Sequence, residues 1–90
     1  MLVARRYVVT GRVQGVGFRF FTEDAARREG LSGFVRNQPG GGVEVVVEGE
    51  LEAMDRFDTA VRQGPRGARV DRVDFESLPP SGRLTGFVIR

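Results

Sequence analysis

Two different spacings of apolar residues follow each other along the first third of the chain. Residues 2–10 alternate loosely between apolar and polar positions, with Tyr7 and Val9 on one side, and this alternation predicts a strand. After a glycine-rich segment, apolar residues recur at helical spacing at Phe18, Phe21 and Ala25. That period predicts a helix, and Gly30 is placed to end it.

A β-hairpin is predicted next. Leu31–Asn37 has the pattern of a second strand, Gln38–Gly42 has the composition of a turn, and Val43–Glu48 has valine at every second position. Glu44 and Glu48 lie on the side opposite those alternating valines. We expect both carboxylates to be solvated, because two acidic residues on one strand face are more typical of a wet surface than of a catalytic pair.

The second half of the chain repeats the sequence of helix and strand. Apolar residues recur at helical spacing at Leu51, Met54, Phe57 and Val61. Gly64 and Pro65 then end this second predicted helix. Ala68–Phe75 and Gly86–Ile89 are predicted strands, separated by a loop rich in proline and glycine.

The resulting order is βαββαβ with an extra strand at the C-terminus. It predicts an α+β fold, an α/β sandwich in which two helices cover one face of a mostly antiparallel sheet. Ninety residues suit one domain, spanning 1–90. Right-handed crossovers place the first strand inside the sheet and the glycine-rich loop beside the end of the second strand. We therefore expect Asn37 to lie near Arg19.

Composition removes several kinds of chemistry. The chain has no histidine, cysteine or lysine, so nucleophilic triads, Ser/Lys pairs and zinc sites lack their usual residues. The 14 basic residues, all arginine, are interspersed with 12 acidic ones, without the basic tail typical of nucleic-acid binding. No apolar run approaches the length of a membrane span, so we expect a cytoplasmic protein, and we expect a monomer because the helix faces are charged.

The segment Gly11–Arg19 is the strongest candidate for a functional site. It joins a strand to a helix and contains three glycines, so the N–H groups at the helix start can face an anion such as phosphate. Arg19 adds a planar cationic group suited to phosphate oxygens. The segment matches neither a Walker P-loop nor a dinucleotide fingerprint. A tight turn beside a solvated arginine is the alternative.

An anion site with one arginine and one amide suits a narrow class of reactions. Phosphoryl transfer depends mainly on positioning and on stabilising charge on the phosphoryl oxygens. No general acid is needed when the leaving group is a carboxylate, with a pKa of about 4, so an acyl phosphate suits the site better than an ordinary ester. Asn37 has the side-chain amide to hold the attacking water. On composition alone, an Asn shortly ahead of Pro-Gly-Gly is more typical of a turn former.

These motifs resemble those of a known family. Gly11–Arg19 resembles the signature of acylphosphatases, and Gly33–Asn37 resembles their second motif, which ends 18 positions after Arg19. The ending Gly86–Ile89 also resembles the end of these proteins, so the likeness covers essentially the whole chain. The segment Gln38–Gly42 departs from the pattern, since relatives often carry Asp, Asn or Thr there.

The resemblance implies a ferredoxin-like fold and hydrolysis of small acyl phosphates to carboxylate and inorganic phosphate, with no metal or cofactor. It implies that Arg19 binds the phosphate and that Asn37 orients the nucleophilic water. The backbone N–H groups implied to bind the phosphate belong to Gln14, Gly15, Val16, Gly17 and Phe18.

Two other hypotheses about the function stay open. One is an acyl- or carbamoyl-phosphate binding domain of a larger carbamoyl-transfer protein, although the ends at Met1 and Arg90 favour a separate enzyme. The other is a nucleic-acid-binding module with the same βαββαβ order. Its third strand would carry two glutamates and no aromatic residue, so we expect neither a nucleic-acid nor a membrane partner.

Overall fold

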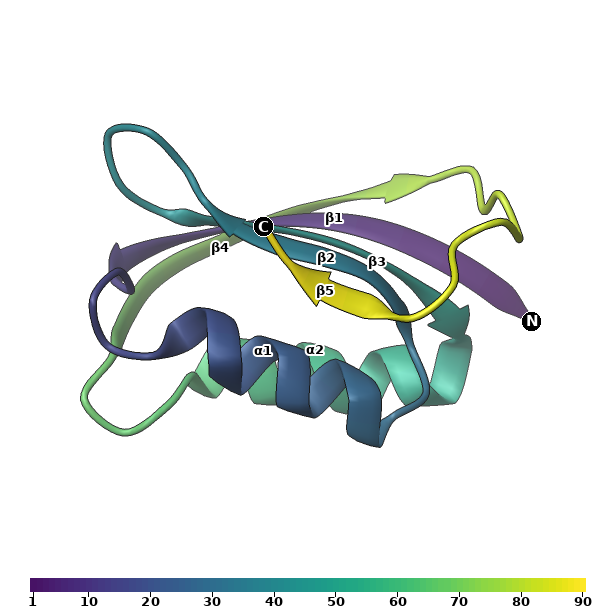
Figure 1. Cartoon of the computed structure of the whole chain (residues 1–90), viewed down its shortest axis with the longest axis horizontal. Helices are drawn as coiled ribbons and strands as arrows, with labels where there is room; N and C mark the ends of the chain where they lie inside the picture. The colour runs from purple at the N-terminus through teal and green to yellow at the C-terminus, as the bar shows by residue number, and fades with distance from the viewer.

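The computed structural model describes residues 1–90 and has two layers, a five-stranded sheet and two helices packed on one of its faces (Figure 1). The elements are β1 (Leu2–Arg12), α1 (Phe18–Arg28), β2 (Ser32–Asn37), β3 (Val43–Glu50), α2 (Leu51–Gln63), β4 (Arg69–Leu78) and β5 (Phe87–Ile89). Neither helix is both long enough and apolar enough to cross a membrane.

The strand order is β4-β1-β3-β2-β5. β1 pairs antiparallel with both β3 and β4, and β2 pairs antiparallel with β3, whereas the short β5 runs parallel to β2. The predicted ferredoxin-like sandwich with its extra C-terminal strand is confirmed. β1 lies inside the sheet, as right-handed crossovers require.

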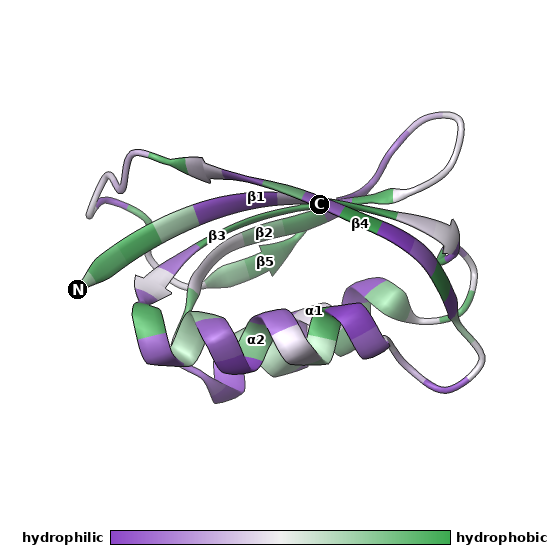
Figure 2. Cartoon of the chain, turned by 180° about the vertical axis from the view of Figure 1, so that it is seen from behind, coloured by the Kyte–Doolittle hydropathy of each residue, from purple (hydrophilic) through white to green (hydrophobic).

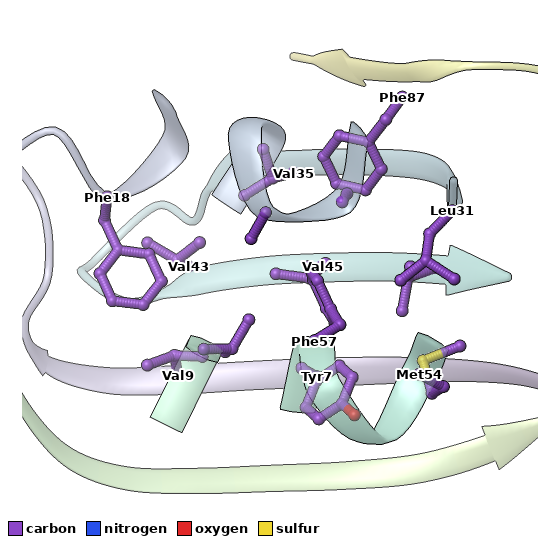
Figure 3. Close-up of a cluster of buried hydrophobic side chains, with 14 of the residues drawn as sticks. Tyr7, Val9, Phe18, Leu31, Val35, Val43, Val45, Met54, Phe57 and Phe87 are labelled. Carbon is purple, nitrogen blue, oxygen red and sulfur yellow. The ribbon is translucent and has the colours of Figure 1, made fainter. Parts of the chain in front are cut away.

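The core lies between the sheet and the helices. Tyr7 and Val9 of β1 stand opposite Val45 and Val43 of β3, and all four are fully buried. Figure 3 shows these residues together with Phe18 of α1 and with Met54 and Phe57 of α2. Both helices carry hydrophobic and hydrophilic residues in turn (Figure 2), because only one side of each packs on the sheet.

The end of α1 follows from local sequence. Gly30 adopts φ +70°, a conformation that a residue with a side chain rarely takes. The N–H of Leu31 then donates to the carbonyl of Ala26 at 2.9 Å, and the Leu31 side chain is buried. The chain thereby turns from the helix directly into β2.

The expectation that Glu44 and Glu48 are solvated is wrong, since they are only 7% and 6% exposed. Glu44 accepts hydrogen bonds from the guanidinium groups of Arg6 and Arg36, which lie on the neighbouring strands. Burial by itself would raise the pKa of Glu44, but these two hydrogen bonds outweigh it and lower the pKa.

Glu48 is buried for a different reason. Its carboxylate accepts hydrogen bonds from the main-chain N–H groups of Ser81 and Gly82, at 2.7 and 2.9 Å. The loop between β4 and β5 therefore folds onto this carboxylate, and the helix-free face of the sheet is partly covered.

Candidate active site

The loop between β1 and α1 leaves its main-chain N–H groups without partners in the protein. Gly15 and Gly17 have φ values of +74° and +77°, in the left-handed region that glycine takes without strain. No N–H group of residues 14–18 donates to a main-chain acceptor, and no side chain caps the start of α1. The loop thus presents unpaired N–H groups at the positive end of the helix dipole, as an anion site requires.

Arg19 and Asn37 lie around one hollow beside this loop. The hollow is lined by Val13, Gly15, Gly17, Phe18, Arg19, Phe20 and Asn37. Figure 1 shows why: the loop before α1 and the connection between β2 and β3 lie at the same end of the molecule. The expected proximity of Asn37 and Arg19 is therefore observed. Among the predicted cradle residues, Gly15, Gly17 and Phe18 line the hollow.

The other two cradle residues have additional roles. The side-chain amide of Gln14 donates to the carbonyls of Gln38 and Gly42, at 2.9 and 2.8 Å. Val16 packs against the core. Sequence reasoning assigned Gln14 only a main-chain role. The signal that points to its side chain is the topology, which places the loop beside a turn whose carbonyls can each accept a second hydrogen bond.

The turn after Asn37 is closed without the side chain of Asn37. The N–H of Gln38 donates to the carbonyl of Gly42 at 3.0 Å, and Gln14 donates to the same carbonyl. A turn-forming Asn would use its side chain locally. The amide of Asn37 is therefore not committed to the turn that follows it.

The side chain of Arg19 is held by the end of the chain. Its Nη1 donates to the main-chain oxygen of Arg90 at 3.3 Å. Arg90 is fixed in turn, because its N–H donates to the carbonyl of Val35 at 2.8 Å and its guanidinium stacks on the ring of Phe34. One of five guanidinium N–H groups is thus used to orient Arg19, and the others are available to an anion.

The electrostatics of the hollow favour an anion. No acidic residue lines it, and its charge comes from Arg19 and from the start of α1. The nearest acidic residues along α1, Glu23 and Asp24, pair with Arg27 and Arg28 one turn later, at 3.2 and 3.4 Å. No group of three or more His, Cys, Asp or Glu side chains is arranged to hold a metal ion.

Comparisons with known proteins identify the family of the chain. The acylphosphatase family model matches residues 5–89. An acylphosphatase of Koribacter versatilis is 48% identical over 94% of this chain and 77% of its own length. One of Pseudomonas paraeruginosa is 51% identical over 91% of this chain and 89% of its own.

Solved structures give the same result. The crystal structure of acylphosphatase from Bacillus subtilis superposes with a TM-score of 0.94 at 36% identity, covering 100% of this chain and 99% of that one. HypF of T. kodakarensis superposes with a TM-score of 0.85 at 36% identity, over 98% of this chain and 12% of that protein. With a family model that spans nearly its whole length and relatives at about half identity, this chain belongs to the acylphosphatase family.

Proposed function

We propose that the N–H groups of residues 14–18, from Gln14 to Phe18, and the guanidinium of Arg19 bind the phosphate of an acyl phosphate, while Asn37 orients the water that attacks phosphorus. The products are a carboxylate and inorganic phosphate. The observation that carries this mechanism is the meeting of free N–H groups, one arginine and one uncommitted amide around a single hollow.

The binding groups act mainly on the transition state. Negative charge on the three equatorial phosphoryl oxygens is stabilised by preorganised N–H donors and by a fixed guanidinium. The loop is held by two glycines in the left-handed region, and Arg19 by Arg90, so little reorganisation is needed when the substrate binds. This arrangement favours stabilisation of developing charge over simple ground-state binding.

The leaving group explains why no acid is required. Hydrolysis of the mixed anhydride releases a carboxylate whose conjugate acid has a pKa of about 4, so it departs as an anion without protonation. The phosphate oxygens can accept the proton of the attacking water. A phosphate ester would release an alkoxide, and the lining of the hollow contains no group to protonate it.

The same fold covers 12% of the longer HypF chain. A second candidate is therefore a domain of a larger protein, one that would bind an acyl or carbamoyl phosphate without hydrolysing it. Turnover separates the two functions. We further propose that residues 1–90 act as a single domain, as a cytoplasmic monomer without a nucleic-acid partner.

The test is phosphate release from acetyl phosphate and benzoyl phosphate in excess EDTA, with ethyl phosphate as the alkyl-ester control. We expect turnover of the acyl phosphates only. Arg19→Ala and Asn37→Ala should each lower kcat/KM by about 10²–10³-fold. The matched controls Arg83→Ala and Gln63→Ala change an arginine and an amide away from the hollow, and both should keep full activity. An active Asn37→Ala variant would contradict the water-orienting role.

A further inference from the structure

Phe20 is an aromatic side chain exposed at the edge of the hollow. Its exposed fraction is 68%, whereas Phe18, two residues earlier on the same helix, is 1% exposed. We propose that the ring of Phe20 binds the acyl group of the substrate and makes the enzyme prefer aromatic and other bulky apolar acyl phosphates. This inference rests on the proposed function.

Phe20 has no evident part in folding. Residues two apart on a helix point in nearly opposite directions, so a helix that buries Phe18 turns Phe20 outward. The buried side of α1 consists of Phe18, Thr22, Ala25 and Ala26. Phe20 is absent from the hydrophobic core and from the aromatic pairs, which include Phe18 with Phe21. Its exposure beside the site therefore has no explanation in packing.

The lining of the hollow leaves one apolar surface for a ligand. Val13 and Phe18 are each only 1% exposed, and Gly15 and Gly17 have no side chain. Arg19 and Asn37 are polar and serve the phosphate and the water. Phe20 is thus the only apolar side chain of the lining that an incoming molecule can cover.

The substrate needs such a surface. Its phosphate faces the N–H groups and Arg19, so the acyl group, joined through the bridging oxygen, must extend from the hollow past its edge. A planar aromatic acyl group can stack on Phe20 and remove apolar area of both partners from water. An acetyl group offers one methyl and gains little. The selectivity should therefore appear in KM and depend on the size of the acyl group.

The experiment compares benzoyl phosphate with acetyl phosphate in the wild type and in Phe20→Ala, Phe20→Tyr and Leu84→Ala. In Phe20→Ala we expect KM for benzoyl phosphate to rise about tenfold, kcat to stay within about twofold, and both constants for acetyl phosphate to stay within about twofold. Phe20→Tyr keeps the ring and should retain the wild-type KM. Leu84→Ala removes an exposed apolar side chain of the β4–β5 loop and should match the wild type.

Two results would overturn the inference. In the first, Phe20→Ala still hydrolyses both substrates, and its ratio of KM values for the two substrates equals that of the wild type. This result would reject the contact between Phe20 and the acyl group but would leave the proposed function intact. In the second, the wild-type protein releases phosphate from neither substrate, and this result would reject both the inference about Phe20 and the proposed function. A circular dichroism spectrum unchanged by the substitution ties the KM change to the contact rather than to the fold.

Discussion

Gln14 connects the two halves of the site through a single side chain. Its amide has two hydrogens, and they hold the carbonyls of Gln38 and Gly42 at the two ends of the turn that follows Asn37. The phosphate loop and the residue proposed to orient water are therefore fixed relative to each other. A misplacement of about 1 Å between such groups is enough to lower a rate substantially.

We predict that Gln14→Ala lowers kcat by about tenfold, because the two hydrogen bonds that tie the turn to the loop are lost and the turn shifts relative to the loop. Inhibition by inorganic phosphate should change by less than about twofold, since the main-chain N–H groups remain. Gln14→Glu should be at least as slow, because a carboxylate facing two carbonyls is repelled. Steady-state kinetics with phosphate inhibition measures both effects. An unchanged kcat in Gln14→Ala would show that the turn after Asn37 keeps its position without the Gln14 side chain.

The role of an individual residue can be predicted from the sequence when it depends on a local motif or on the order of the strands. Arg19 and Asn37 belong to motifs, and strand order alone brings them together, so both could be placed in advance. Gln14 and Phe20 differ from them because their roles are set by what faces their side chains. The burial of Glu44 depends on Arg6 and Arg36 on two neighbouring strands, and alternation along one strand carries no information about that pairing.

At the level of elements, periodic segments were predictable and the loop between β4 and β5 was not. The helical stripe of α2 and the alternating valines of β3 report directly which side meets the core. The loop is placed by the carboxylate of Glu48, 33 residues before Ser81, which has no periodic signal. The predicted strand up to Phe75 also extends to Leu78, because pairing with β1 continues to Ala4.

Gly33 is the point where β2 fits between its two neighbours. A Cβ at this position would lie 1.9 Å from the main-chain oxygen of Val46, and φ is +141°. The N–H of Gly33 also donates to the carbonyl of Gly86 at 2.9 Å, at the start of β5. A side chain here would therefore separate β2 from β3 at the base of the strand that ends at Asn37.

We predict that Gly33→Ala lowers the free energy of unfolding by at least about 2–3 kcal/mol, because main-chain atoms must move to admit the methyl group. Gly67→Ala is the matched control: its φ is +94°, but a Cβ there would meet no atom within 4 Å. That variant should cost only the local strain of about 1 kcal/mol. Urea unfolding followed by circular dichroism gives both values. Equal losses in the two variants would assign the effect to φ alone.

Over the whole molecule, most arginines pair with carboxylates, and almost nothing titrates near neutral pH. The chain lacks histidine, cysteine and lysine, so the ordinary pKa values of its side chains lie near 4, near 10 and above 12. The amine of Met1 is the exception, and it is exposed beside Glu50. The Glu50 carboxylate raises the pKa of this amine. We therefore predict a free energy of unfolding that changes by less than about 0.5 kcal/mol between pH 6 and pH 7.5, below the range in which the amine titrates. A steep change in that interval would contradict it.

The acid limit should be set in part by Glu44. Its pKa is lower in the folded than in the unfolded chain, so its contribution is present above the ordinary glutamate value of about 4 and is lost as pH falls through the folded value. We predict that Glu44→Gln is less stable than the wild type by about 1–3 kcal/mol at pH 7, because Arg6 and Arg36 lose their shared carboxylate. The difference should shrink by pH 3. Urea unfolding at both values measures it, and a difference independent of pH would contradict the assignment.

At high pH, the stability of the fold should be limited by Tyr7 of β1, whose side chain reaches α2. Its hydroxyl donates to Asp58 at 2.8 Å, and burial raises the pKa of Tyr7 to about 12. Because the folded value exceeds the ordinary value of about 10, the contribution is complete below pH 10 and is lost as pH rises toward 12. Tyr7→Phe should be less stable by about 1 kcal/mol at pH 7 through the lost hydrogen bond. The phenylalanine has no proton to lose, so the free energy of unfolding of this variant should fall less steeply above pH 10. If urea unfolding shows the same fall above pH 10 in both proteins, a group other than Tyr7 causes the loss of stability.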